Sequence, residues 1–164
     1  MEAVLGKNLI LLWRLLEDAT TSAGAKLAFQ TEHSVSVSRS ADTTETKDGP
    51  LVTGGGLEEE IPFNCIMAKD DPVVAMLQKA LRENKVLEQW EVDITKATAN
   101  KYPATYRQGL LSELEKSANT EDLVELSGTF VVNGLAQTGE VELTAEQAEV
   151  VQYVFRDTAI VTAP

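Results

Sequence analysis

The chain has 164 residues, of which 43% are hydrophobic, and a formal net charge of −12. This length is typical of a single domain that buries about two thirds of its unfolded surface. The acidic balance argues against a nucleic-acid-binding protein, because such binding needs clustered Lys and Arg, and the longest apolar run, within residues 9–16, is too short to cross a bilayer.

The chain begins with six residues that show no periodicity, and we expect them to form a free N-terminal extension. Residues 9–16 are apolar at nearly every position, so periodicity alone does not distinguish a helix from a strand. The polar segment 17–24 leads directly into the next alternating stretch, which favours a strand, a turn and a second strand. The start lacks the features of a signal peptide, so we expect synthesis in the cytosol.

Residues 26–67 contain two stretches of alternating apolar and polar residues, the pattern of strands with one buried face. Between them, residues 39–56 are rich in Ser, Thr, Asp and Gly and are too long for a tight turn. We expect a long inter-strand loop here, either disordered or functional, and a scaffold around it. The apolar positions of the two stretches are Leu27, Phe29, Val35 and Val37, then Leu57, Ile61, Phe63, Cys65 and Met67.

A helix is predicted over residues 72–84. Asp71 followed by Pro72 is typical of a helix start, because the carboxylate caps free N–H groups and proline suits the first helical position. Apolar residues then recur at helical spacing, and Lys and Arg gather towards the end of the segment, where cations suit the helix dipole.

Alternation beyond the helix indicates further strands around Trp90, Tyr106 and Phe130, with turns at residues 100–103, 117–119 and 134–139. The Trp90 strand is expected to have one wet face. Thr144 with Gln147 three residues later is the pattern of a capping box, which predicts a short helix through residue 151, followed by a final strand.

The sequence contains no constellation of catalytic or metal-binding residues. His33 is the only histidine, and we interpret it as a strand histidine at a sheet edge. Cys65 is the only cysteine, so no disulfide forms within the chain. Glu59 points away from Glu58 and Glu60 if the segment is a strand, which indicates a solvated edge. We therefore expect neither an enzyme nor a cofactor.

Acidic residues are concentrated in the C-terminal third, where residues 111–164 contain ten acidic and two basic residues, a net charge of −8. The ordinary interpretation is solubility. The more specific interpretation is a surface that repels a polyanion, and the residues alone leave both open.

Several segments follow one another in a recognisable order. They are LAFQTEH at residues 27–33, SRSADTTETKDG at 38–49, AKDDPV at 68–73, WEVDI at 90–94, YRQGLLSELEKSANTEDLVELSGTFVVNG at 106–134 and FRDT at 155–158. Together they resemble the major tail protein family of long-tailed, non-contractile bacteriophages of Gram-positive hosts. The resemblance covers most of the chain.

The resemblance implies a tail-tube protein of the virion, assembled in the host cytoplasm. Such proteins form homohexameric rings that stack into a hollow tube, through which DNA passes without specific binding. The implied partners are further copies of the chain and the tape-measure, tail-tip and terminator proteins, with no membrane. The implied fold is a β-sandwich or barrel with a flanking helix, related to the inner-tube proteins of contractile injection systems.

Alternation in the residues agrees with that fold. We expect one mainly β (α+β) tail-tube domain over residues 1–164, an antiparallel β-sandwich or barrel of about eight strands with one flanking α-helix and a short C-terminal helix. By resemblance, the 39–56 loop joins subunits and rings. The residues to which this role transfers are Asp42, Thr43, Thr44, Glu45, Thr46, Lys47, Asp48 and Gly49.

In such a tube, acidic side chains on the polar face of a strand with few cations nearby would line the channel. The candidates are Glu91, Asp93, Glu113, Glu115 and Glu125. The alternative hypothesis is a ligand- or receptor-binding β-sandwich module that grips its target with the 39–56 loop.

Overall fold

The computed structural model describes residues 1–95, 98–144 and 147. In this part of the chain, eight strands form one curled antiparallel sheet in the order β2-β1-β6-β7-β8-β5-β3, and β4 pairs with β5 outside this path. The strands are β1 (Leu9–Leu15), β2 (Ala25–Lys26), β3 (Gln30–His33), β4 (Ser36–Thr46), β5 (Gly49–Ile66), β6 (Leu87–Asp93), β7 (Lys101–Ser117) and β8 (Glu125–Glu142). Short 3-10 turns occur at Gly6–Asn8 and Leu16–Asp18.

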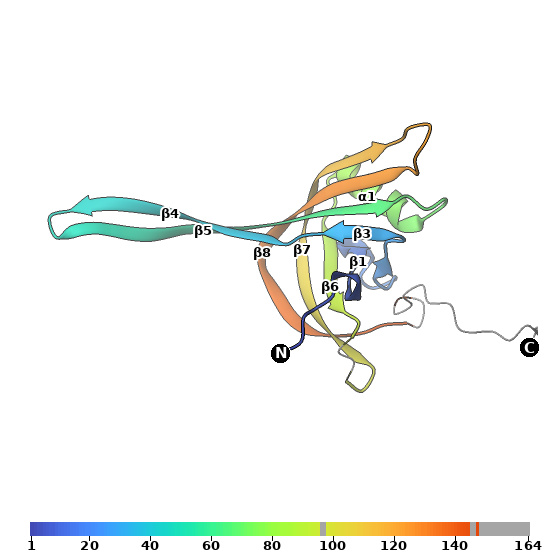
Figure 1. The fold of residues 1–164 in the computed structure, drawn as a ribbon, viewed down its shortest axis with the longest axis horizontal. Coiled ribbons are helices and arrows are strands. Elements are labelled where there is room, and N and C mark those ends of the chain that lie inside the picture. The colour runs from blue at the N-terminus through green and yellow to red at the C-terminus, as the bar shows by residue number, and fades with distance from the viewer. Residues whose placement is uncertain (96–97, 145–146, 148–164) are drawn as a thin grey trace, which may run out of the picture.

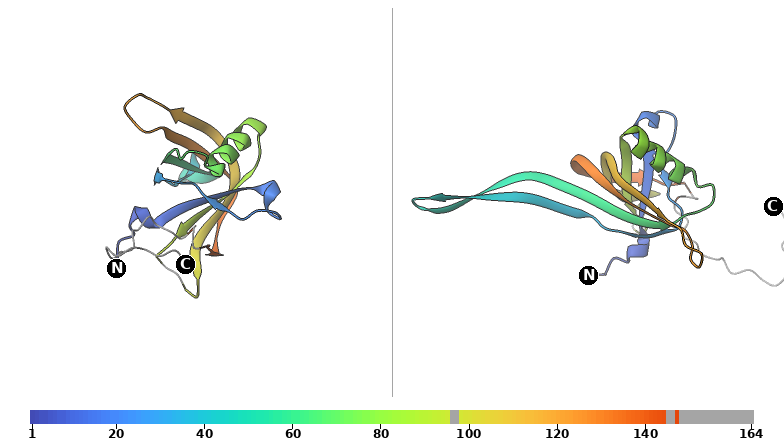
Figure 2. Two further views of the ribbon diagram at one scale, coloured as in Figure 1. Left: turned by 90° about the vertical axis from the view of Figure 1, so that its right-hand side faces the viewer. Right: turned by 90° about the horizontal axis from the view of Figure 1, so that it is seen from above.

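Helix α1 (Pro72–Glu83) packs against one face of the sheet, as Figure 2 shows. Its first turn is capped by Asp71, whose carboxylate accepts hydrogen bonds from the N–H groups of Val73 and of Ala28. The helix ends at Asn84, which adopts a left-handed conformation with φ of 53°. The predicted helix is confirmed to within one residue, because its start and stop signals are local.

The main core lies between α1 and the sheet face that it covers, which we call the helix face. Trp13 is at its centre, with its ring centroid 5.0 Å from that of Phe63 and 5.3 Å from that of Phe130. A smaller cluster around Leu12 and Val92 lies on the opposite, helix-free face. The predicted mainly β, antiparallel fold with one flanking helix is confirmed.

The strand predicted over residues 57–67 is confirmed, since Ile61, Phe63 and Cys65 are buried on the helix face. The preceding strand is broken into β2, β3 and the start of β4. Phe29 has φ of 50°, which interrupts the extended backbone. Of the apolar positions expected to face the core here, Leu27 is buried, whereas Phe29 and Val37 are exposed.

The turn predicted at residues 100–103 is present but shifted, since the chain reverses at Ala99 and Asn100, between the bridged Thr98 and Lys101. The turn predicted at residues 134–139 is absent because β8 is longer than expected. Pro103 lies within β7 opposite Glu140, and since the β6 pairing ends at Ala104, its missing N–H costs no bond to β6. Residues 134–139 are part of β8, where a register shift between Tyr106 and Gln108 of β7 accommodates Gly134 at φ of 69°.

Residues 1–5 have neither helix nor strand and are exposed. The capping box is present: the Thr144 N–H donates to the Gln147 side chain, and the Gln147 N–H donates to Thr144 Oγ1. The remainder of the expected short helix and the final strand lie outside the described residues. No helix in the described ranges has the length and apolarity to span a membrane.

Candidate assembly surfaces

The outer parts of β4 and β5 form a long hairpin that leaves the sheet, which we call the arm (residues 36–59). The pairing of β5 with β8 ends at Glu60 opposite Val131, and beyond it β4 is the one strand in the described part of the chain that pairs with β5. Figure 1 shows the arm projecting far from the rest of the molecule. At the usual strand rise it is roughly 35 Å long.

The arm shows that the predicted 39–56 loop is wrong. The segment is a hairpin with one bulge, between Arg39 and Ala41, and it turns at Lys47 and Asp48. Gly49 has φ of 118°, a conformation that glycine adopts easily. The proposed contact residues Asp42, Thr43, Thr44, Glu45 and Thr46 lie on the outer half of β4, followed by the turn. Ser and Thr residues form strands here because the backbone groups of the two strands pair with each other, and this pairing does not require a buried apolar face.

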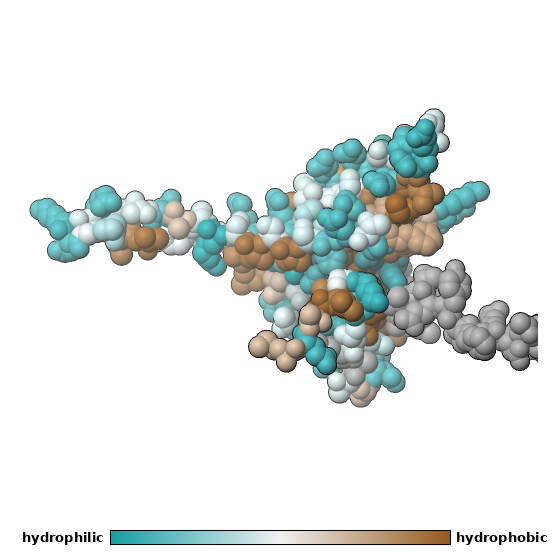
Figure 3. All heavy atoms as spheres, in the orientation of Figure 1, coloured by the Kyte–Doolittle hydropathy of each residue, from teal (hydrophilic) through white to brown (hydrophobic). Residues whose placement is uncertain are grey.

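The two sides of the arm differ in polarity. The register places Val37, Ala41 and Val52 on the side that continues the helix face, which we call the apolar side; Val37 is 55% and Val52 63% exposed. The other side has mostly polar residues, among them Asp42 and Thr53, with one exposed hydrophobic residue, Leu51. Figure 3 shows hydrophobic residues along the lower edge of the arm and at its root. An isolated hairpin is marginally stable in water, so this arm is suited to packing against another molecule.

A group of carboxylates lies on the helix-free face. Glu113 and Glu115 of β7 lie opposite Thr129 and Ser127, and Glu125 lies opposite Ser117, whereas the neighbouring apolar residues point to the helix face. Glu60 of β5 shares this side, and all four carboxylates are exposed. We call Glu60, Glu113, Glu115 and Glu125 the acidic face. The strand segments 58–66, 108–115 and 125–133 contain no Lys or Arg.

Glu91 and Asp93 are not part of the acidic face, so the five predicted channel residues do not form one set. Both are half-buried and share the helix-face side of β6 with Leu87. His33 Nε2 donates to Glu91 Oε2 at 2.6 Å, and Asp93 accepts from the N–H and hydroxyl of Thr95. The prediction that β6 has one solvent-exposed face is wrong for its N-terminal half, because both faces of the strand are covered there and Gln89 is fully buried.

The His33–Glu91 pair predicts a pH dependence of stability. The hydrogen bond from His33 lowers the pKa of the Glu91 carboxyl below its ordinary value of 4.5, and nearby positive charge adds to the effect. A carboxyl with a lowered pKa in the folded state contributes stability above the unfolded pKa, and this is lost as the pH falls through the folded value. We therefore expect the wild type to lose more stability than Glu91→Gln between about pH 5 and pH 3.

Urea unfolding at a series of pH values measures this difference, with Glu58→Gln on the exposed arm as the control. The control should show the same pH dependence as the wild type. Parallel curves for the wild type and Glu91→Gln would show that the pair contributes nothing.

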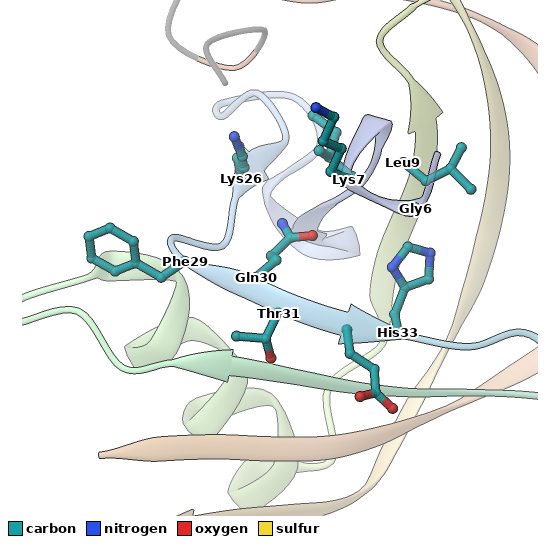
Figure 4. Close-up of a pocket in the computed structure, with 10 residues that line it drawn as sticks. Gly6, Lys7, Leu9, Lys26, Phe29, Gln30, Thr31 and His33 are labelled. Carbon is teal, nitrogen blue, oxygen red and sulfur yellow. The ribbon is translucent and has the colours of Figure 1, made fainter. Parts of the chain in front are cut away.

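The two edges of the curled sheet meet at a seam, where His33 lies on the edge strand, as predicted. Gln30 of β3 closes the seam: its side-chain oxygen accepts from the Leu11 N–H at 2.9 Å, and its nitrogen donates to the Leu11 carbonyl at 2.7 Å. Beside it is an open groove of about 630 Å³. Figure 4 shows Gln30 inside the groove, with Lys7 on the opposite wall and Phe29 at one end. No pattern in the sequence indicates this role of Gln30.

No group of three or more metal-binding side chains occurs within residues 1–95, 98–144 and 147. The burial of Cys65 raises the pKa of its thiol to about 11, which suits a packing role. The surfaces that distinguish the molecule are therefore the arm, the acidic face and the groove.

Comparison with solved structures shows the same fold in virus-like tails. The tail tube of phage SPP1 matches with a TM-score of 0.80 at 20% identity, covering 98% of this chain and 95% of that one. The tail of an empty gene transfer agent particle, with C6 symmetry, matches with a TM-score of 0.67 at 12% identity, covering 84% of this chain and 99% of the other.

Two relatives are similar in sequence. The tail tube protein gp17.1* of Bacillus phage SPP1 is 26% identical over 144 residues, which cover 88% of this chain and 54% of that protein. A putative tail protein of Staphylococcus phage phiMR25 is 29% identical over 140 residues, covering 81% of this chain and 72% of that protein. The chain thus spans about half the length of the SPP1 relative.

The fold and these relatives define a class of structural proteins found in phage tails. A family model described as phage tail tube protein matches residues 3–138, and the chain belongs to this family. The resemblance to tail proteins of phages of Gram-positive hosts is confirmed.

Proposed function

We propose that copies of this chain form homohexameric rings that stack into a phage tail tube, and that the arm joins each ring to its neighbours. The observation that supports this role is the amphipathic arm, whose apolar side is exposed in the single chain. The polar residues at its outer end, Asp42 to Gly49, would then contact the next subunits. The same exposed surface would be an aggregation hazard if nothing covered it.

Ring closure is supported by unpaired strand edges. Among the described residues, β8 pairs over positions 132–142 with β7 alone, so its other edge would be available to a strand of a neighbouring subunit. Contacts between two different surfaces generate a closed ring when the rotation between subunits closes. Six subunits are proposed because the gene transfer agent tail, which shares the fold, has C6 symmetry.

The acidic face is proposed to line the channel, with Glu113, Glu115 and Glu125 as its predicted members and Glu60 as an addition. Lys or Arg on a channel wall would bind phosphates and release counterions, and carboxylates avoid this. At physiological salt the Debye length is about 8 Å, so repulsion acts close to the wall and keeps DNA from adhering. Glu91 and Asp93, on the other side of the sheet, are not included.

We further propose that the tube is assembled in the host cytoplasm together with the tape-measure, tail-tip and terminator proteins, as the family resemblance implies. Negative-stain electron microscopy of the purified protein tests the central proposal. We expect rings or tubes with sixfold symmetry, at high concentration or after addition of a tail-tip complex. A monomer under all these conditions would contradict the proposal and favour the alternative of a binding module that uses the arm.

A further inference from the structure

A row of polar side chains lies inside the sheet, where an apolar core would be expected. Trp13 of β1, Gln89 of β6 and Arg107 of β7 are successive cross-strand partners. Trp13 and Gln89 are fully buried, and Arg107 is 4% exposed. The row continues to Glu59 of β5, whose carboxylate accepts a hydrogen bond from Arg107 Nε at 2.5 Å.

This row also contains the buried side-chain atoms that lack a hydrogen-bond partner in the described part of the chain. They are Trp13 Nε1, both polar atoms of the Gln89 amide, and one terminal nitrogen of Arg107. Buried polar groups normally find partners, and a buried ion pair is often no more stabilising than apolar residues of the same size. Stability alone is therefore a weak explanation for the row.

The position of Glu59 offers another explanation. It is the last residue of β5 before the strand begins to pair with β8 at Glu60, and its partner on β4 is Val37. The ion pair thus lies at the root of the arm. The bulge in the arm, between Arg39 and Ala41, lies further out and cannot fix the root.

A second hydrogen-bonded pair, His33 and Glu91, also connects the root of the arm to the centre of the sheet, from strand β3. His33 of β3, which lies opposite Phe63 of β5, bonds to Glu91 of β6. The positive charge of Arg107 also acts on the Glu91 carboxyl. The two pairs therefore tie β3 and β5, the strands on either side of the arm root, to the central strands β6 and β7.

We propose that Glu59 and Arg107 are positioning residues, which fix the direction in which the arm leaves the sheet. A buried ion pair has one favourable geometry, whereas apolar side chains at the same place tolerate several. The consequence for assembly rests on the proposed function, because an arm with a variable direction would reach a neighbouring ring less often.

The direction of the arm can be measured in the unassembled protein. Spin labels at Thr44→Cys on the arm and Ala75→Cys on α1, in a Cys65→Ala background, report the distribution of distances between the two elements. The test variant is Glu59→Leu with Arg107→Met, which removes both charges. The control is Glu58→Leu, an exposed neighbour on the other side of the same strand.

We expect the double variant to unfold cooperatively near the wild-type midpoint, to at least double the width of the distance distribution, and to lower the yield of tubes at least tenfold. The control should keep the wild-type width. A folded double variant with the wild-type width would overturn the proposal. If the double variant does not fold, the distance distribution is measured for Glu59→Gln, which keeps the size of the side chain. A wild-type width for this variant would likewise overturn the proposal.

The distance measurement separates this inference from the proposed function. If the wild type forms no tubes, the proposed function fails, and the width still decides whether the pair positions the arm. If the width doubles and tubes form at the normal yield, the link between arm direction and assembly is overturned.

Discussion

A variant with a shortened arm is expected to fold normally and to form no tubes. Ala41 and Gly54 are cross-strand partners, so replacing residues 42–53 with Asn-Gly closes the hairpin with a favoured two-residue turn. The removed residues are exposed and contribute nothing to the core, so the free energy of unfolding should change by less than about 1 kcal/mol. Thermal unfolding and negative-stain microscopy measure the two effects.

Matched point variants test whether the apolar side of the arm makes the contact. Val52 and Thr53 are adjacent and exposed on opposite sides of the arm. Val52→Asn should weaken each contact by about 2 kcal/mol, roughly 30-fold in the association constant, whereas Thr53→Asn, which adds no charge opposite Asp42, should have little effect. Tubes of normal length from the shortened protein would contradict the assigned role of the arm.

The parts of the fold that sequence predicts well are those specified by local chemistry. The cap at Asp71 and the proline after it defined the start of α1, and the alternation around Phe63 defined the inner half of β5. Both signals act within a few residues, so they hold whatever the rest of the chain does.

The arm could not be predicted because its two strands pair with each other and their side chains are not packed into the core. Neither side of residues 39–56 is buried in one subunit, so no period-2 pattern of apolar residues marks the strands. The role of Gln89 and Arg107 was also hidden. Polar residues in a strand usually indicate a wet face, and only the three-dimensional packing, in which Gln89 and Arg107 are buried, shows that this face is covered.

Strand parity accounts for the finding that three of the five predicted acidic residues share one face of the sheet and two do not. Glu113, Glu115 and Glu125 lie on long strands whose apolar neighbours face α1, so parity placed them correctly on a common side. Glu91 has the same parity signal on a central strand, where His33 from a distant strand occupies the space above it. Odd or even position along a strand determines which face of the sheet a residue lies on, whereas the fold as a whole determines what covers that face.

Lysines on the acidic face are expected to slow the passage of DNA. The variant Glu113→Lys, Glu115→Lys and Glu125→Lys changes the net charge from −12 to −6, since each substitution adds two units. If this face lines the channel, each lysine can contact a phosphate. Three such contacts should bind roughly 40-fold more tightly at about 50 mM than at about 200 mM salt. Assembly should continue, because substitutions at exposed positions usually cost little stability.

The control variant has the same net charge but a different charge distribution. Glu2, Glu83 and Glu121 are exposed and lie outside the strands of the acidic face, and changing all three to Lys adds the same six units. Particles assembled with each variant can be compared for the rate of DNA ejection at low and high salt. For the acidic-face variant we expect slow DNA ejection at low salt and a rate close to that of the wild type at high salt. The control variant should eject DNA at the wild-type rate at both salt concentrations. An unchanged rate at low salt would mean that these carboxylates serve solubility and do not protect the channel.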